Sequence, residues 1–330
     1  MTHSAAMGRL RAWPRTRLAN LPTPLLRADR LAAELGVDDI LVKMDAESGF
    51  ALGGNKVRKL EFVLAPHRVD GVTCLVTAGG PQSNHCRVTA AYAARRGLRC
   101  ILVTQAPAPE HPTGNALLHR LFGAEIVTVA DRTDRAPTMH DVAAAVDAED
   151  GRAMVVPIGA STGLGSLGYA LAALELVEQL DALGQRPDET SVFVSSSSCG
   201  TLAGLLLGVA LLGRPDVRLV GVSADAPADE LRATTLDIAR EGASLLDVEP
   251  HFGAVELVTI DDQVGDGYGI ATAASDSATT YFAKLEGIVL DPTYTAKAAA
   301  GMIDWIRRGE VGPSHRVVFL HTGGHPGLLA

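Results

Sequence analysis

The chain has 330 residues, of which 47% are hydrophobic and 20% charged, and its formal net charge is −9. This composition is typical of a globular protein that is long enough to bury one large core or two smaller ones. The acidic balance and the lack of a concentrated basic patch argue against a nucleic-acid partner. No apolar run approaches the roughly 20 residues that span a bilayer, so we expect no membrane association.

The cysteines indicate a reducing compartment. Cys74, Cys86, Cys100 and Cys199 show no CxxC spacing and no regular framework. Cys74 and Cys100 lie inside apolar runs, which is typical of small core residues. The first 25 residues are polar, carry several arginines and contain no apolar segment of the signal-peptide type. We therefore expect a cytoplasmic protein.

Apolar runs and helical patterns alternate along the whole chain. The runs predicted to form buried parallel strands are 40–44, 74–77, 100–104, 125–129, 154–157, 191–194, 219–223, 257–260 and 317–321. The segments predicted to form helices are 29–35, 55–64, 84–96, 115–121, 138–148, 167–183, 202–212, 230–240, 269–285 and 296–307. Strand–helix alternation predicts an α/β fold with open, mostly parallel twisted sheets and flanking helices. About ten strands are many for one open sheet, so we expect two sheets and two domains.

One segment places a lysine at the start of a helix. Residues 53–62 read Gly-Gly-Asn-Lys-Val-Arg-Lys-Leu-Glu-Phe. The glycines predict a sharp turn, and Asn55 is a suitable N-cap, which places Lys56 in the first helical turn. The positive helix N-terminus and any burial lower the pKa of this amine, and Schiff-base chemistry needs a neutral amine. The alternative is an ordinary exposed lysine.

Two further strand-to-helix loops are suited to anions. Residues 77–85 read Thr-Ala-Gly-Gly-Pro-Gln-Ser-Asn-His, a tight loop whose backbone N–H groups can bind a carboxylate or phosphate. Residues 195–201 read Ser-Ser-Ser-Ser-Cys-Gly-Thr, and their hydroxyls add donors suited to a phosphate monoester. There is no Walker A ending for a nucleoside triphosphate. Each loop is also compatible with an ordinary polar turn.

A competing pattern points to a dinucleotide-binding oxidoreductase. Residues 163–168 match GxGxxG and follow an apolar run. That fold requires an acidic residue at the end of the next strand, about 20 residues on, whereas the strand predicted over 191–194 is followed by serines. We therefore interpret the glycines as positions of close backbone packing, where the chain crosses between domains.

The C-terminal part supplies three more candidates. Tyr294 precedes a predicted helix, and Tyr268 stands between two glycines; each is suited to stacking on a ring or to acid chemistry, or to core packing. Thr322 follows the last predicted strand, at the sheet edge where ligands bind in parallel α/β folds. Lys297 is interpreted as a structural or surface residue. No histidine pair has metal-ligand spacing, so we predict no catalytic metal.

Taken together, these segments resemble the D-cysteine desulfhydrase and 1-aminocyclopropane-1-carboxylate deaminase family. The likeness runs in the expected order from about Leu21 to the end of the chain. It is carried by residues 21–25, 53–62, 77–85, 159–163, 291–297 and 321–324. The resemblance implies a pyridoxal-5′-phosphate (PLP) enzyme of the tryptophan-synthase-β-like fold (fold type II). It further implies a large PLP-binding domain, residues 1–52 plus 166–330, with a small α/β domain, residues 53–165, inserted into it.

The resemblance also implies roles for individual residues. Lys56 would be the Schiff-base lysine, and Tyr294 would flank the cofactor ring with Thr322 facing the pyridine nitrogen. Residues Ser83, Asn84 and His85 would hold the substrate carboxylate, with Asn84 also near the phenolic oxygen of the cofactor. The phosphate would be held by Ser198, Cys199, Gly200 and Thr201. A homo-oligomer, most simply a dimer, is implied as well.

The reaction is inferred from one difference within the family. The deaminase branch has a glutamate after the tyrosine, where this chain has Thr295. A carboxylate beside the pyridine nitrogen makes the ring a strong electron sink, and a hydroxyl does so much less. We therefore expect α,β-elimination from a small β-substituted amino acid, first D-cysteine, which gives pyruvate, sulfide and ammonia. Lys56, Ser83, Tyr268 and Tyr294 are the candidate catalytic residues. Cysteate sulfo-lyase and 1-aminocyclopropane-1-carboxylate deaminase activities are the alternatives.

The chain also departs from the family pattern. Met44 and Ala46 replace the usual arginine and aspartate, and Ser197 and Cys199 stand in the phosphate loop where glycines are expected. These changes leave open a divergent member with another substrate.

Overall fold

The computed structural model describes residues 3–107, 109–184 and 189–330. In these ranges the strands are β1 Leu25–Arg27, β2 Asp39–Lys43, β3 Cys74–Ala78, β4 Arg99–Thr104, β5 Glu125–Thr128, β6 Ala153–Val155, β7 Thr190–Ser196, β8 Val217–Ser223, β9 Leu257–Ile260 and β10 Arg316–Leu320. The α-helices are α1 His3–Ala12, α2 Asp29–Leu35, α3 Asn55–Val63, α4 Asn84–Arg96, α5 Gly114–Leu121, α6 Arg135–Ala148, α7 Gly163–Ala182, α8 Gly200–Leu212, α9 Ala228–Leu245, α10 Ala273–Glu286 and α11 Thr295–Arg307. Short 3₁₀ turns are η1 Asp45–Glu47, η2 Phe50–Leu52, η3 Pro66–Arg68, η4 Ile158–Ala160, η5 Phe252–Ala254 and η6 His325–Leu329.

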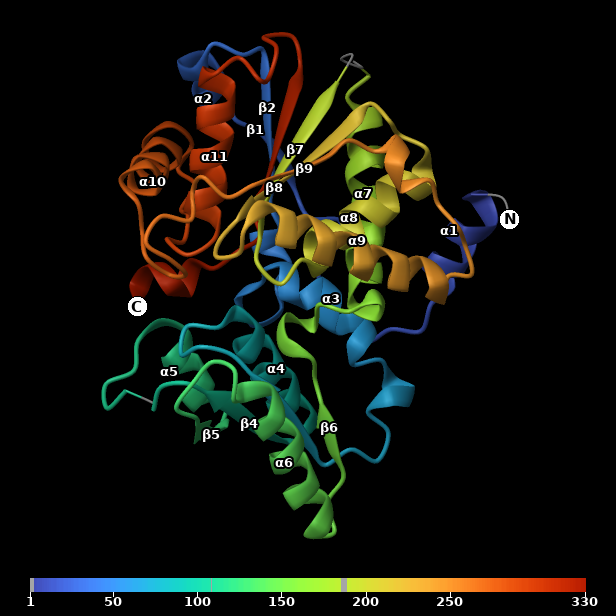
Figure 1. The fold of residues 1–330 in the computed structure, drawn as a ribbon, viewed down its shortest axis with the longest axis vertical. Coiled ribbons are helices and arrows are strands. Elements are labelled where there is room, and N and C mark those ends of the chain that lie inside the picture. The colour runs from blue at the N-terminus through green and yellow to red at the C-terminus, as the bar shows by residue number, and fades with distance from the viewer. Residues whose placement is uncertain (1–2, 108, 185–188) are drawn as a thin grey trace.

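The strands form two separate sheets, which lie one above the other in Figure 1. The large sheet has the order β1-β2-β10-β7-β8-β9 and the small sheet the order β5-β4-β3-β6. Every neighbouring pair is parallel except β1 and β2. The predicted α/β fold with two mostly parallel sheets is therefore confirmed. The small sheet lies wholly inside the predicted insertion 53–165, whose exact boundaries stay a prediction.

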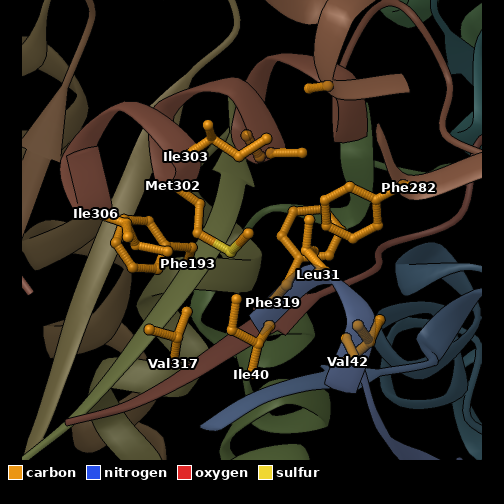
Figure 2. Close-up of a cluster of buried hydrophobic side chains, with 14 of the residues drawn as sticks. Leu31, Ile40, Val42, Phe193, Phe282, Met302, Ile303, Ile306, Val317 and Phe319 are labelled. Atoms are coloured by element: carbon orange, nitrogen blue, oxygen red, sulfur yellow. The ribbon is translucent and has the colours of Figure 1, made fainter. Parts of the chain in front are cut away.

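Helices cover both faces of the large sheet, and the apolar residues of its strands alternate between them. On one face α2, α10 and α11 pack on a cluster that includes Phe193, Phe282, Met302 and Phe319 (Figure 2). On the other face α7, α8 and α9 cover Val192, Val194 and the neighbouring apolar residues of the strands. Burial on both faces explains why these strands are nearly continuous apolar runs in the sequence.

The GxGxxG glycines are packing positions, as predicted. They lie in the first turns of α7, which crosses α3 between the two sheets. A Cβ atom at Gly168 would lie 2.2 Å from the carbonyl oxygen of Arg58, and one at Gly165 would lie 1.9 Å from that of Ala160. Only glycine permits this approach of backbones.

A buried ionic cluster ties α3 to the large sheet. The guanidinium of Arg58 on α3 donates from Nε and Nη2 to Asp45, with both distances 2.8 Å, and from Nη1 to Glu175 of α7 at 3.0 Å. Lys43, at the end of β2, contacts the same Glu175 at 2.5 Å, and the Tyr169 hydroxyl donates to Asp45 at 2.5 Å. Asp45 and Arg58 are at most 2% exposed, so the pair is shielded from solvent. The cluster fixes the helix that carries Lys56.

All four cysteines are buried and unpaired. Cys74, Cys86 and Cys100 lie on β3, α4 and β4 around the small sheet, whereas Cys199 precedes α8 of the large sheet. Among the residues that the structure describes, no helix is long and apolar enough to cross a membrane.

Candidate active site

A cavity of about 240 Å³ lies between the two sheets, at the carboxyl ends of their strands. Nearly every site residue predicted from the sequence lines it: Lys56, Ser83, Asn84, His85, Ser198, Cys199, Thr201, Tyr268, Tyr294 and Thr322. Gly200 starts α8 beside the cavity without lining it, and a Cβ there would lie 2.7 Å from the Ser161 hydroxyl. The residues are thus brought together from segments far apart in the chain. Their individual roles remain predictions.

Lys56 is the second residue of α3, in the first turn as predicted. The expected N-cap was wrong: Gly54 occupies that position, and the side chain of Asn55 instead donates to the Thr201 hydroxyl at 3.0 Å. Burial lowers the pKa of Lys56 from 10.5 to about 8, and a hydrogen bond with Lys59 opposes the shift. At pH 7 this raises the neutral fraction of the amine from about 1 in 3,000 to about 1 in 10, and the neutral form is the nucleophile.

Lys59 is a buried cation that sequence reasoning missed. It lies one helical turn after Lys56, is 1% exposed, and donates from Nζ to the Ser161 hydroxyl at 2.9 Å. Ser161 in turn shares a hydrogen bond of 2.8 Å with Ser198. Burial, followed by the charge of Lys56, pushes the pKa of Lys59 well below its usual value. The only available signal was its spacing of three residues from Lys56, which places both on one side of the helix.

The loop before α4 holds Asn84 in a fixed orientation. Ser83 is the N-cap, and its hydroxyl accepts a hydrogen bond from the Cys86 N–H at 3.2 Å. The amide oxygen of Asn84 accepts from Arg87 Nη1 at 3.0 Å and from Asn115 Nδ2 at 2.9 Å. Arg87 is buried, and its other hydrogen bonds go to Asn115 and to the Gly53 carbonyl oxygen. The loop therefore combines a helix N-terminus with a rigid amide.

The imidazole of His85 points to the small sheet rather than toward solvent. Thr77 donates its hydroxyl proton to the Val156 carbonyl oxygen at 2.7 Å, so the 2.8 Å contact with His85 requires Nε2 to carry a proton. Burial, with the charges of Lys56 and Lys59, lowers the pKa of His85 well below 6.5. The ring is neutral, and a carboxylate at this loop would be left with the backbone N–H groups.

The serine-rich loop ends in a strained residue. Cys199 is the N-cap of α8 and has a φ of 62°, a left-handed conformation that favours glycine. This explains why the family pattern has glycine there. The Cys199 side chain is buried, and its Sγ lies 3.6 Å from the Leu231 carbonyl oxygen. The hydroxyls of Ser198 and Thr201 flank it on the cavity wall.

The two tyrosines form a pair at one end of the cavity. Their hydroxyls are hydrogen-bonded to each other, and the rings meet edge to face with centroids 5.8 Å apart. Burial raises the pKa of Tyr268 and raises that of Tyr294 well above 10. Both phenols are therefore protonated at neutral pH and are able to donate a proton.

Thr295 does not line the cavity, whereas Thr322 does. The Thr295 hydroxyl is fully buried and hydrogen-bonds Asp291 at 2.7 Å, so it stabilises the start of α11. Lys297 is structural, as interpreted from the sequence: its Nζ donates to the carbonyl oxygens of Val264 and Gly267 at 2.7 and 2.8 Å. It thereby holds the loop that carries Tyr268.

Charged residues that the sequence analysis did not single out complete the wall. Arg132 comes from the connection between β5 and α6, and Arg135 is the first residue of α6. Asp225 and Glu230 come from the region after β8. Arg132 pairs with Asp225 across the two sheets at 3.0 Å and lies over the Tyr268 ring, 5.5 Å from its centroid. No local pattern marks these residues, because their contact depends on how the sheets are packed together.

Comparison with known proteins identifies the family. Residues 16–323 match the model of the pyridoxal-phosphate dependent enzyme family. The chain belongs to this family. It is 38% identical over 326 residues to the D-cysteine desulfhydrase of Salmonella typhi, with 97% of each chain covered, and equally similar to that of Salmonella newport. The enzyme is thus PLP-dependent, as predicted.

Solved structures agree with the fold. The structure of a 1-aminocyclopropane-1-carboxylate (ACC) deaminase homologue matches with a TM-score of 0.88 and 32% identity, covering 99% of this chain and 97% of the other. Threonine deaminase isoform 2 from Solanum lycopersicum matches with a TM-score of 0.68 at 16% identity, over 98% of this chain and 84% of the other. The second likeness concerns the fold alone and confirms fold type II.

The donors around the cavity fit pyridoxal phosphate. The amine of Lys56 is suited to its aldehyde, and the hydroxyls of Ser198 and Thr201 at the N-terminus of α8 are suited to its phosphate. The Lys59 amine hydrogen-bonds Ser161 and pairs with no carboxylate of the described chain, so a phosphate at this loop would supply a counter-charge that favours its protonated form. Thr322 lines the cavity with a hydroxyl, so it would offer the pyridine nitrogen no carboxylate.

Proposed function

We propose that the enzyme is a carbon–sulfur lyase that catalyses α,β-elimination on a small β-substituted amino acid, with D-cysteine as the first candidate. The observation that carries the proposal is the buried Lys56, with a pKa of about 8, in a cavity flanked by two serine-bearing helix N-termini. The similarity to D-cysteine desulfhydrases over nearly the whole chain supports it. D-cysteine would give pyruvate, sulfide and ammonia.

Different residues of the cavity have different roles in the proposed elimination. When bound, pyridoxal phosphate supplies an aldehyde for amine capture and a ring that withdraws electrons from the α-carbon. Ser83 and the N-terminus of α4 hold the substrate carboxylate, and Asn84 orients the bound molecules. Lys56 Nζ, or a nearby hydroxyl, accepts the α-proton. The protonated pair Tyr268 and Tyr294 covers the reacting face and donates a proton to the departing group.

The side chains of the cavity also bear on the alternative reactions. Opening of a cyclopropane ring needs strong electron withdrawal, and Thr322 offers only a hydroxyl at the place proposed for the pyridine nitrogen. This disfavours 1-aminocyclopropane-1-carboxylate deamination. Elimination of sulfite from cysteate uses the same steps as elimination of sulfide and stays in the substrate set. The dinucleotide alternative has lost its support, since the GxGxxG glycines are occupied by helix packing.

Absorption spectra test the proposal. Wild type reconstituted with PLP should show an absorption band at the edge of the visible range that Lys56→Ala lacks. Addition of D-cysteine should shift this band and release sulfide and pyruvate. Lys284→Ala, on an exposed part of α10, is the matched control and should behave as wild type. A Lys56-dependent band without sulfide or pyruvate from D-cysteine, L-cysteine or cysteate would refute the proposed elimination on sulfur substrates.

We also propose a cytoplasmic homo-oligomer, most simply a dimer. Four unpaired cysteines fit a reducing compartment. An apolar groove lined by Leu52, Leu117, Leu118 and Leu329 offers a surface for a second copy. Sedimentation velocity should give a dimer, and Leu329→Arg should shift it to monomer. A monomer in sedimentation would contradict the proposed dimer. Fractionation of cells should place the enzyme with soluble cytoplasmic markers, and a membrane-bound fraction would contradict the proposed compartment.

A further inference from the structure

Arg135 is a buried cation to which the described residues supply no carboxylate partner. It is the first residue of α6, is 8% exposed, and lines the same cavity as Lys56. Its Nε donates to the carbonyl oxygen of Arg132 at 3.1 Å. Within the described chain, its two terminal NH₂ groups have neither a hydrogen-bond acceptor nor an ion-pair partner. These nitrogen atoms are not among the fully buried ones, so they stay open to an anionic ligand in the cavity.

The acidic residues of the cavity do not neutralise this charge. Asp225 pairs with Arg132 at 3.0 Å, and Glu230 is an exposed residue at the start of α9. Burial lowers the pKa of Arg135, the charge of Arg132 lowers it further, and Cys86 and the two tyrosines Tyr268 and Tyr294 follow as weaker, opposing influences. The two arginines and two carboxylates of this wall balance in formal charge, but the terminal N–H donors of Arg135 are engaged by neither carboxylate in the described chain.

The other anion positions of the site are already assigned. Under the proposed function, the cofactor phosphate lies at the loop 195–201 and the substrate carboxylate lies at Ser83. Arg135 is on a different element from both, and its Nε donates to the carbonyl oxygen of Arg132, whose guanidinium lies over the Tyr268 ring. A third anion position near the reacting face is suited to the side chain of the substrate.

We propose that Arg135 binds an oxyanion on the β-carbon of the substrate, so that the preferred substrates are amino acids with a β-sulfonate or a β-phosphate ester. This inference rests on the proposed function, keeps its elimination, and places substrates with a β-oxyanion ahead of D-cysteine within its substrate class. A guanidinium presents a planar fork of N–H donors that matches sulfonate or phosphate oxygens in a bidentate manner. D-cysteine, whose β-substituent has no oxygen, would make poorer use of this group.

The reaction balances with water as the only co-reactant. The α-proton is removed, the Cβ–S or Cβ–O bond breaks, and its electron pair leaves with sulfite or phosphate. One water molecule then hydrolyses the remaining unsaturated amine to pyruvate and ammonium. In the departing anion the negative charge stays next to Arg135, so the same contact stabilises both substrate and leaving group.

Steady-state kinetics of the holoenzyme test the inference. Pyruvate release is measured for both enantiomers of cysteine, cysteate and O-phosphoserine, with wild type, Arg135→Gln, Arg135→Lys and the surface control Arg96→Gln. We expect wild type to favour cysteate or O-phosphoserine, and Arg135→Gln to raise the KM for them by about 10- to 100-fold. Values for cysteine should change less than about threefold, Arg135→Lys should recover part of the loss, and Arg96→Gln should match wild type.

A binding measurement separates this inference from the proposed function. Titration calorimetry with 3-sulfopropanoate, which has both anions but no amine, should give tighter binding than propanoate in wild type and equal binding in Arg135→Gln. If the enzyme turns over cysteine but not cysteate or O-phosphoserine, and binds 3-sulfopropanoate no more tightly than propanoate, the proposed role of Arg135 is overturned. The proposed elimination would remain. Equal losses for cysteine and cysteate in Arg135→Gln would also overturn it. Absence of pyruvate from every substrate, with the calorimetric preference present, would refute the elimination and keep the anion site.

Discussion

Gly168 lies where α7 crosses α3, and replacing it with alanine tests how closely the site depends on that crossing. The added Cβ would lie 2.2 Å from the Arg58 carbonyl oxygen and 2.6 Å from its carbon, whereas real Cβ contacts are essentially never under 3.0 Å. The helices must therefore separate by about 0.8 Å or more. Overpacking of this kind costs about 1–3 kcal/mol, against a gain of up to about 1 kcal/mol in helix propensity. We expect a net loss of about 1–2 kcal/mol in the free energy of unfolding.

Activity should fall as well, because Lys56 is two residues from the displaced Arg58. A misplacement near 1 Å can cost on the order of 100-fold in rate, so we expect kcat/KM to drop by about 10- to 100-fold. Urea unfolding and steady-state kinetics measure the two effects. Gly8→Ala in α1 is the matched control, since nothing lies within 4 Å of its added Cβ; it should be as active as wild type and slightly more stable. The reasoning is refuted if Gly168→Ala behaves like this control.

Three other predictions concern the site and its support. Labelling of Lys56 in the apoprotein by an amine-reactive probe, followed by peptide mass spectrometry, should rise with pH and level off above pH 8, because only the neutral amine reacts and its pKa is lowered from 10.5 to about 8. A rise that continues to pH 10.5 would contradict the lowered pKa. Arg58→Met should cost about 3–5 kcal/mol in urea unfolding, because the buried Asp45 loses its paired guanidinium and Glu175 keeps only Lys43; a loss below about 1 kcal/mol would show that the Arg58 pairs add little. Tyr294→Phe should lower kcat by about 100-fold or more with little change in KM, if its protonated hydroxyl acts in the reaction; an unchanged kcat would limit Tyr294 to packing.

Most of the fold and the main site residues were predictable because their signals are local. Each predicted strand and helix is present, with ends that differ by a few residues. Lys56, Ser83 and Ser198 each stand where a parallel strand or a glycine turn passes into a helix, and such places meet at one edge of parallel sheets. The glycines of α7 were interpreted correctly because the acidic partner of a dinucleotide site is missing from the sequence.

The missed elements had weak local patterns. Strand β1 has only three residues and lies at the antiparallel edge of the large sheet, with two of them exposed, so it shows no buried run. Helix α1 is rich in polar residues and has little amphipathic periodicity. Its burial of Ala6 and Leu10 depends on packing against α7 and α8.

The missed site residues depend on tertiary structure. Arg132 and Arg135 reach the cavity only because the small sheet packs against the large one, more than 70 residues from either Lys56 or Tyr268 in the chain. Asn55 was assigned by a local rule, and its side chain instead hydrogen-bonds Thr201, a neighbour brought near by the fold. Local propensity therefore locates the ends of helices better than the partners of their side chains.

Because every cysteine is buried, the four thiols report on local opening of the structure through their rates of chemical modification. A thiol reagent can modify Cys74, Cys86, Cys100 or Cys199 only after the surrounding structure opens, so each modification rate measures the free energy of a particular opening. Burial raises the pKa of Cys86 to about 11, which suppresses the reactive thiolate of the closed state. Three of the probes follow the small sheet and Cys199 follows the serine-rich loop of the large one. Ligand occupancy, domain opening and global unfolding can thus be followed separately in the unmodified protein, without an introduced label.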